Sequence, residues 1–217
     1  MQALPRDIGW IEVVCGPMFS GKTSELIRRL ERCVYARQRI EIFKPSVDTR
    51  YAEEEIVTHS QMSLRAKPVR NALEILDRSD SGSEVVGIDE AQFFDGTLIE
   101  VVQELAARGK RVIIAGLDQD FRGEPFEPIP SLMAVAEFVS KQLAICMVCG
   151  NPAGRSQRMV SSTNQVVLGA GESYEARCRR CHTVEAVERP VQEELFTAAS
   201  LVPVEMDEVS AGSQFAG

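Results

Sequence analysis

Hydrophobic residues along this chain occur in two recurring patterns, short continuous runs and stripes with helical spacing. Residues 10–15 form a run of the kind that becomes a buried strand. Farther along, apolar residues share one helical face and charged residues at 28, 29, 31 and 32 share the other; the apolar set is Leu26, Ile27, Leu30, Cys33 and Val34. The chain therefore begins with a predicted strand, a connection over residues 16–23 and an amphipathic helix.

The same two patterns alternate as far as about residue 145. Apolar runs predict strands over residues 39–43, 65–69, 84–88 and 111–115. Helical stripes predict helices after Asn71, over residues 97–108 and over residues 132–139. Because strands and helices alternate with short connections, the predicted fold class is α/β, with a parallel sheet flanked by helices.

The connection after the first strand carries a complete phosphate-binding loop pattern, G-x-x-x-x-G-K-[ST]. Its residues are Gly16, Pro17, Met18, Phe19, Ser20, Gly21, Lys22 and Thr23. Backbone N–H groups and a helix N-terminus suit phosphate oxygens, an ammonium suits the β and γ phosphates, and a hydroxyl suits Mg²⁺. The loop predicts a P-loop NTPase-type sheet that binds ATP and Mg²⁺.

Two acidic residues follow the strand predicted over residues 84–88. Asp89 at the end of this strand is expected to hold Mg²⁺ beside Thr23. Glu90 is expected to point towards the group that attacks the γ-phosphate. A strand that ends in two carboxylates is common by itself. It indicates a nucleotide site here because it occurs together with the loop at Gly16.

The loop after the strand at 111–115 is rich in glycine, proline and charge over residues 116–126. It leaves the carboxyl end of a strand, where open α/β sheets bind ligands. Phe121 and Phe126 in this loop are expected to cover a base or a sugar. The alternative is that both rings cover the domain's own surface.

Four cysteines form two C-x-x-C pairs separated by 28 residues, namely Cys146, Cys149, Cys178 and Cys181. Two such turns predict a closed Cys₄ zinc site, which is structural because it has no open position. His182 could compete with Cys181 as the fourth ligand. Between the pairs, residues 166–174 are either a lid over the second substrate, with Tyr174 packed on it and backbone groups near Val167 and Gly169 contacting polar edges, or an exposed hairpin.

Chain length and composition limit the number of domains. A chain of 217 residues with 44% hydrophobic content has room for one main domain and a small module. We predict a nucleotide-binding domain over residues 1–145, a zinc-ribbon-like C-terminal domain over 146–189 and a disordered acidic tail over 190–217. No apolar run approaches the 18 or more residues of a membrane span and no signal pattern precedes the first strand, so we expect a cytoplasmic protein without a membrane partner.

The net charge of −8 argues against a surface that coats nucleic acid. Residues 190–217 contribute five acidic residues and no Lys or Arg, which leaves −3 for the rest of the chain (−8 + 5). We therefore expect small-molecule substrates.

Together these motifs resemble one family, the zinc-containing type II thymidine kinases, over about residues 9–187. The resemblance rests on the phosphate loop, residues 48–51 (D-T-R-Y), residues 88–94 (I-D-E-A-Q-F-F), residues 117–126, the four cysteines and Tyr174. It implies transfer of the γ-phosphate of ATP to the 5′-hydroxyl of thymidine, and possibly of deoxyuridine, to give dTMP for DNA synthesis by salvage. It also implies a homotetramer inhibited by dTTP.

The resemblance also assigns residues. Glu90 matches the general base. Positions near the sugar and phosphates are Asp48, Arg50 and Gln92, and positions around the thymine are Met18, Phe93, Leu117, Phe121, Phe126, Ser156, Val167, Leu168, Gly169 and Tyr174. Ser156 stands where some relatives have threonine.

Two other functions stay open at this point. The run Asp89-Glu90-Ala91-Gln92 looks like the D-E-x-x box of helicases, which would make the chain a nucleic-acid-dependent motor. Alternatively, Arg177, Arg179 and Arg180 around the second C-x-x-C pair could belong to an ATP-regulated zinc module that binds nucleic acid. The absence of a second nucleotide domain and the acidic charge both favour the kinase.

Overall fold

The computed structural model describes residues 8–46, 55–56, 64–161 and 173–184. All of them belong to one compact unit that spans residues 1–187. Five predicted site residues lie outside the described residues, namely Asp48, Arg50, Val167, Leu168 and Gly169. Within the described part of the chain, no helix is both long and apolar enough to cross a membrane.

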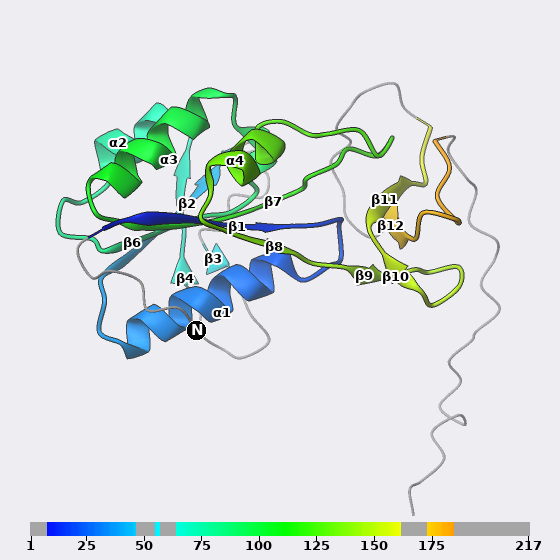
Figure 1. Cartoon of the computed structure of the whole chain (residues 1–217), viewed down its shortest axis with the longest axis horizontal. Helices are drawn as coiled ribbons and strands as arrows, with labels where there is room; N and C mark the ends of the chain where they lie inside the picture. Colours follow the sequence, from blue (N-terminus) through cyan, green and yellow to red (C-terminus); the bar gives the residue numbers. More distant parts are fainter. Residues whose placement is uncertain (1–7, 47–54, 57–63, 162–172, 185–217) are drawn as a thin grey trace, which may run out of the picture. The chain divides into compact units, whose positions relative to one another are not determined.

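A six-stranded sheet forms the centre of this unit (Figure 1). Its strands are β1 (Trp10–Cys15), β2 (Ile40–Pro45), β5 (Lys67–Val69), β6 (Val85–Ile88), β7 (Arg111–Gly116) and β8 (Phe138–Lys141). Their order is β5-β2-β6-β7-β1-β8, and every neighbouring pair is parallel. The α/β class with a parallel sheet is confirmed, and the carboxyl ends of β1, β6 and β7 meet at one edge.

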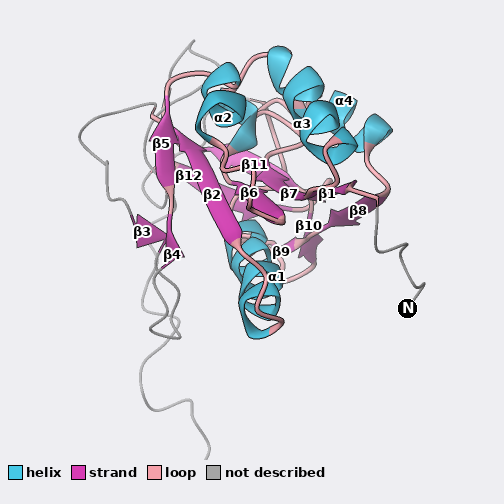
Figure 2. Cartoon of the chain, turned by 90° about the vertical axis from the view of Figure 1, so that its left-hand side faces the viewer, coloured by secondary structure: helices cyan, strands magenta, loops and turns pink. Residues whose placement is uncertain are grey.

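Helices cover both faces of this sheet (Figure 2). On one face lies α1 (Lys22–Tyr35), and on the other lie α2 (Leu73–Arg78), α3 (Thr97–Ala107) and α4 (Ile129–Val135). Successive side chains of a strand point to opposite faces of the sheet. Because helices cover both faces, the strands are apolar on both sides. In β7, for example, Val112 and Ile114 pack in the core beneath α2, α3 and α4, while Ile113 and Ala115 pack with α1.

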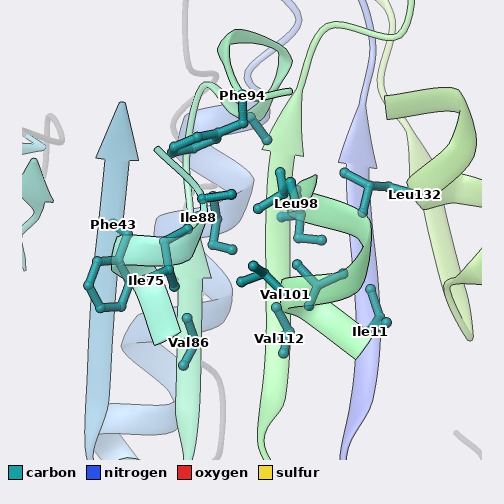
Figure 3. Packing of buried hydrophobic residues seen from close by; sticks show 14 of the residues in the cluster. Ile11, Phe43, Ile75, Val86, Ile88, Phe94, Leu98, Val101, Val112 and Leu132 are labelled. Atoms are coloured by element: carbon teal, nitrogen blue, oxygen red, sulfur yellow. The ribbon is translucent and has the colours of Figure 1, made fainter. Parts of the chain in front are cut away.

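The larger of the two sheet cores lies beneath α2, α3 and α4 (Figure 3). Ile75 of α2 and Leu98 and Val101 of α3 contribute side chains that are at most 1% exposed. They pack in one cluster with strand residues such as Phe43 and Ile88. This packing fixes the strands, and with them the loops at their carboxyl ends.

The helix predicted over residues 132–139 is wrong in its second half. The helix α4 ends at Val135, and Phe138–Lys141 form the edge strand β8, parallel to β1. The Glu137 carboxylate between these elements accepts the backbone N–H of Ile11 at 2.7 Å. The apolar residues at 138 and 139 belong to a strand that β1 pairs, a long-range contact that local helical spacing does not reveal.

Short strands form the rest of the described chain. The two-residue strands β3 (Glu55–Ile56) and β4 (Leu64–Arg65) pair antiparallel. After β8 come β9 (Ala144–Ile145), β10 (Pro152–Ala153), β11 (Arg155–Arg158) and β12 (Tyr174–Arg177), in two antiparallel pairs. We call β9–β12 and the four cysteines the cysteine module. It has its own small core, made of Ala144, Cys146, Ala153, Ala176 and Cys178.

Candidate active site

The phosphate loop joins β1 to α1, as the sequence predicts. Gly21 precedes the helix with a left-handed backbone (φ 79°), and α1 begins at Lys22. The loop starts at Gly16, where a Cβ atom would lie 2.4 Å from the backbone oxygen of Gln142. Only glycine fits there, because the chain after β8 runs against the loop and the Gln142 N–H donates to the Cys15 oxygen at 2.7 Å. The loop therefore ends at a helix N-terminus, a setting that favours anions.

The Lys22 ammonium is held over this loop by a hydrogen bond to the Pro17 oxygen at 2.8 Å. Burial lowers the pKa of Lys22, and the charges of Glu90, Asp89 and Asp118 oppose that effect. Three carboxylates that follow β6 and β7 thus favour the charged form of the ammonium. An arriving phosphate would meet a cation already placed between the loop and the sheet edge.

Thr23 and Asp89 form the second pair of groups at the loop. The Thr23 hydroxyl donates to the Asp89 carboxylate at 3.3 Å, which joins the start of α1 to the end of β6. Asp89 is buried, and its burial together with the neighbouring Glu90 charge raises the pKa of Asp89 to about 7. A hydroxyl and a carboxylate are both oxygen ligands of the kind that Mg²⁺ prefers, so this pair fits the predicted ion.

Glu90 differs from Asp89 because its side chain is exposed. Its backbone is left-handed (φ 50°, ψ 41°), an uncommon conformation for a residue other than glycine. One carboxylate oxygen accepts the Gln92 side-chain amide at 2.6 Å. Gln92, in the short helix η2 (Ala91–Phe93), is itself buried and accepts the Leu117 N–H at 3.0 Å. The amide thus fixes the exposed carboxylate to the end of β7.

The cysteine module meets the phosphate loop through Ser156 of β11. The Ser156 hydroxyl accepts the backbone N–H of Met18 at 2.9 Å. Ser156 is buried, and the sequence resemblance placed it near the base. In the structure its oxygen supports the loop backbone, a role that sequence reasoning missed because the two residues are 138 positions apart.

Two of the predicted aromatic residues come together beside β11. Phe121 and Tyr174 are both buried, and the Arg158 guanidinium contacts both. Its carbon lies 3.5 Å from the centre of the Phe121 ring, and its Nη2 donates to the Tyr174 hydroxyl at 3.0 Å. Sequence reasoning did not single out Arg158, since an arginine in a polar stretch predicts an exposed side chain.

The remaining predicted base-site residues belong to other segments, at or near the phosphate loop and the carboxyl ends of β6 and β7. Phe93 in η2, Leu117 after β7, Met18 in the phosphate loop and Phe126 are all half-buried. The Phe126 N–H donates to the Asp118 oxygen at 3.1 Å and closes the loop after β7.

Asp118, which is not among the predicted site residues, is a buried carboxylate at the start of the loop after β7. Asp118 lies two residues after β7 and forms an ion pair with Lys141 at the end of β8. Burial, followed by the Asp118 charge, raises the pKa of the Cys15 thiol to about 11. The cysteine beside the phosphate loop is therefore a protonated core residue.

The four predicted zinc ligands converge. Sulfur atoms of Cys146, Cys149, Cys178 and Cys181 all lie within 4.8 Å of one another, and Cys149 Sγ is 3.6 Å from the sulfurs of both Cys178 and Cys181. A tetrahedral Zn²⁺ with bonds of about 2.3 Å requires sulfurs about 3.8 Å apart, so the residues fit the ion. His182 lies outside this cluster, and its Nε2 is 2.8 Å from the Phe121 oxygen.

The arginines that could have favoured a nucleic-acid surface are not equivalent. Arg177 is buried, pairs with Glu175 at 2.5 Å and donates to the Cys181 oxygen at 3.2 Å. It thus stabilises the module from inside, whereas Arg179 and Arg180 are exposed. Two exposed arginines are a small electrostatic footprint for a nucleic acid.

Comparison with known proteins agrees with this arrangement. A family model described as "Thymidine kinase" matches residues 9–182 of the chain. A protein named "Thymidine kinase" from Rhodothermus sp. (strain ITI 518) is 60% identical over 174 residues, which cover 80% of this chain and 81% of that protein. The residues that the family model matches include the phosphate loop, the ends of β6 and β7 and all four cysteines.

Proposed function

This chain belongs to the thymidine kinase family, and from that membership we propose that it transfers the γ-phosphate of ATP to the 5′-hydroxyl of thymidine. The observation that supports this most directly is the placement of Glu90. An exposed carboxylate stands beside the hydrogen-bonded Asp89–Thr23 pair, at the phosphate loop. The products are dTMP and ADP, which suits a role in deoxynucleoside salvage for DNA synthesis.

The phosphate side of the reaction falls to the loop and its neighbours. Backbone N–H groups of residues 19–23, at the N-terminus of α1, bind the phosphate oxygens, and Lys22 offsets charge on the transferring group. Thr23 and Asp89 would hold Mg²⁺, which supplies charge neutralisation on the β and γ phosphates. Asp48, Arg50 and Gln92 complete the phosphate and sugar contacts in this proposal, and Gln92 also orients Glu90.

Glu90 acts on the sugar hydroxyl in the proposed step. The 5′-oxygen forms a bond to the γ-phosphorus, the bond from that phosphorus to the β–γ bridging oxygen breaks, and the hydroxyl proton passes to the Glu90 carboxylate. A neutral hydroxyl is a weak nucleophile, so a carboxylate within hydrogen-bond reach lowers the barrier. The exposure of Glu90 leaves it accessible to a substrate from solvent.

The base would lie against apolar and aromatic side chains. We assign this role to Met18, Phe93, Leu117, Phe121, Phe126 and Tyr174, with Ser156 holding the loop and backbone groups of Val167, Leu168 and Gly169 meeting polar edges of the pyrimidine. A flat apolar site discriminates poorly by a single methyl group, so deoxyuridine remains a second substrate in this proposal.

The zinc site has a structural role in this proposal. Zn²⁺ held by Cys146, Cys149, Cys178 and Cys181 would stabilise four very short strands around a small core. We propose the corresponding division into residues 1–145, 146–189 and an acidic tail over 190–217. A cytoplasmic location accords with cysteines grouped for metal binding.

Assembly and regulation are also proposed from family membership, as a homotetramer that dTTP inhibits. Exposed apolar side chains on the edge strand β8 and the adjoining cysteine module support assembly, namely Val139, Leu143, Ile145, Met147 and Val148. Light scattering after size exclusion tests the subunit number.

The decisive experiment measures ADP release from ATP and Mg²⁺ with one added acceptor per reaction. The acceptors are thymidine, deoxyuridine, deoxycytidine, deoxyadenosine and single-stranded DNA. We expect stimulation by thymidine and a smaller one by deoxyuridine. Stimulation by DNA alone would support the motor instead, and no stimulation by any acceptor would contradict the kinase.

A further inference from the structure

Arg158 occupies an unusual position for a charged residue. It is 2% exposed, and among the residues that the structure describes it is the largest fully buried side chain. It ends β11, directly opposite Tyr174 at the start of β12 in the antiparallel register. Residues opposite each other on paired strands project from the same face, which explains how the guanidinium reaches the Tyr174 hydroxyl.

The same guanidinium lies over the Phe121 ring, which comes from a different part of the chain. A distance of 3.5 Å from the guanidinium carbon to the ring centre is that of direct contact with the ring face. The Tyr174 ring centre is 5.6 Å away. Arg158 therefore joins an aromatic residue of the loop after β7 to an aromatic residue of the cysteine module.

Two further contacts hold the same loop against the module. The Phe121 backbone oxygen is 2.8 Å from His182 Nε2. Gly123 has no Cβ, and a Cβ there would lie 1.6 Å from the Arg155 guanidinium, so Arg155 packs directly on the loop backbone. The contacts from β11 and from the segment after Cys181 show that the loop and the module are docked together, with Arg158 making the contact to the aromatic ring.

We propose that Arg158 is a positioning residue for nucleoside binding, which fixes the Phe121 and Tyr174 rings against which a pyrimidine base packs. This inference rests on the proposed function, because it takes thymidine as the ligand. The guanidinium covers one face of Phe121, so the base would meet the rest of the ring. Arg158 thereby acts through the two aromatic residues and not on the phosphoryl group.

The chemistry of arginine suits this position better than that of lysine. A guanidinium is planar and weakly hydrated, and it can stack on one aromatic ring while donating a hydrogen bond in its own plane to a second residue. An ammonium is compact and strongly hydrated, and it cannot make both contacts in the same geometry. A variant that keeps only the charge should therefore fail to restore the arrangement.

The proposal predicts a specific kinetic pattern. Arg158→Met should raise KM and Kd for thymidine at least tenfold, while kcat falls less than threefold and KM for ATP changes less than twofold. The separation is expected because binding of the base is lost while the phosphate loop, Asp89 and Glu90 are untouched. Arg158→Lys should resemble Arg158→Met to within threefold. The matched control is Arg179→Met, an exposed arginine of the same module, which should match wild type.

A double-mutant comparison tests the route through Phe121. Phe121→Leu alone should weaken thymidine binding, and adding Arg158→Met should change KM by less than threefold more, since the two residues act as a unit. Zinc content and circular dichroism establish that each variant is folded. If Arg158→Met does not fold, Arg158→Lys in the wild-type and Phe121→Leu backgrounds decides the question by the same criterion.

Three results would overturn the inference. They are a folded Arg158→Met enzyme with wild-type KM for thymidine, full rescue by lysine, and fully multiplicative effects of the two substitutions. These outcomes differ from failure of the proposed function, which would appear as a wild-type protein whose ADP release does not respond to thymidine.

Discussion

The side-chain nitrogen of Gln92 lies 2.6 Å from the carboxylate of Glu90, while the oxygen of the same amide accepts the Leu117 N–H. One buried amide thus connects the proposed base to the end of the neighbouring strand. Removing it should leave the carboxylate free to rotate and leave the Leu117 N–H without this acceptor.

We expect Gln92→Leu to lower kcat about tenfold or more, because small misplacements of a catalytic group carry large penalties. Kd for thymidine should rise by a smaller factor than kcat falls, through loss of the proposed sugar contact of Gln92. The check is steady-state kinetics beside a thymidine titration, with Gln103→Leu on the exposed side of α3 as the matched control. Unchanged kcat in a folded Gln92→Leu enzyme would show that the amide does not orient Glu90.

Glu90→Gln should lower kcat by a factor on the order of 10² or more, the usual contribution of a general base. The amide keeps the size of the side chain and cannot take the proton, so Kd for thymidine should be retained. Glu104→Gln, at an exposed pair with Arg108 on α3, serves as the control. Near-normal turnover of Glu90→Gln would remove Glu90 from the mechanism.

Ser156→Ala should destabilise the protein by roughly 1–3 kcal/mol, because the Met18 N–H loses its acceptor in a buried setting. The same change should raise KM for ATP, since the loop backbone is no longer held. Ser156→Thr retains the hydroxyl and should behave nearly as wild type. Denaturant unfolding and ATP kinetics test both variants, and equal stability of the alanine and threonine variants would contradict the argument.

The buried carboxylate of Glu12 should make stability depend on pH. Burial alone would raise the pKa of Glu12, but hydrogen bonds from Arg111 and Trp10 and the charges of Arg111 and Arg29 outweigh burial and lower it. A pKa below the unfolded value stabilises the fold above that value, and the stabilisation is lost as the pH falls through the folded pKa. Stability should therefore decline on acidification below about pH 4.5.

Glu12→Gln should cost on the order of 3 kcal/mol at neutral pH, the scale for breaking a buried ion pair, and the difference from wild type should shrink in acid. Glu104→Gln removes an exposed pair and should cost less than about 1 kcal/mol. Denaturant unfolding across the pH range measures both variants. A difference between Glu12→Gln and wild type that does not vary with pH would show that another group is responsible.

Removing zinc should affect nucleoside binding before ATP binding. The cysteine module has a core of only five buried residues, so we expect it to depend on the proposed metal for stability. Chelation or Cys149→Ser should release the contacts of Arg158 and His182 with Phe121, and Kd for thymidine should rise at least tenfold. Titrations of thymidine and ATP after metal removal provide the test, with Cys33→Ser as the thiol control in α1. Retention of thymidine affinity by the zinc-free protein would make the module dispensable for this site.

Local patterns predicted the first half of the site because each element carries its own signal. The apolar run 10–15, the glycine loop and the amphipathic stripe after it correspond to β1, the phosphate loop and α1. The strand order β5-β2-β6-β7-β1-β8 was beyond such patterns, because no residue marks which strand will be its neighbour. For the same reason the predicted helix over residues 132–139 runs into the first two residues of β8.

The strand β11 shows why the other half was harder to predict. Its sequence, R-S-Q-R, contains no apolar residue, yet Ser156, Gln157 and Arg158 are all buried. Each has a partner far along the chain: Met18 for Ser156, Thr183 for Gln157 and Phe121 for Arg158. Polar residues that are buried by distant partners look like surface residues in the sequence.

The left-handed backbone at Glu90 has a consequence for the evolution of this protein. In a regular strand, Asp89 and Glu90 would point to opposite faces, but the turn at Glu90 brings both carboxylates near Lys22. Asparagine or glycine would adopt this backbone more comfortably and would remove the repulsion that raises the pKa of Asp89. Stability alone would therefore favour another residue at position 90, and the proposed role of Glu90 as general base gives a reason for the glutamate.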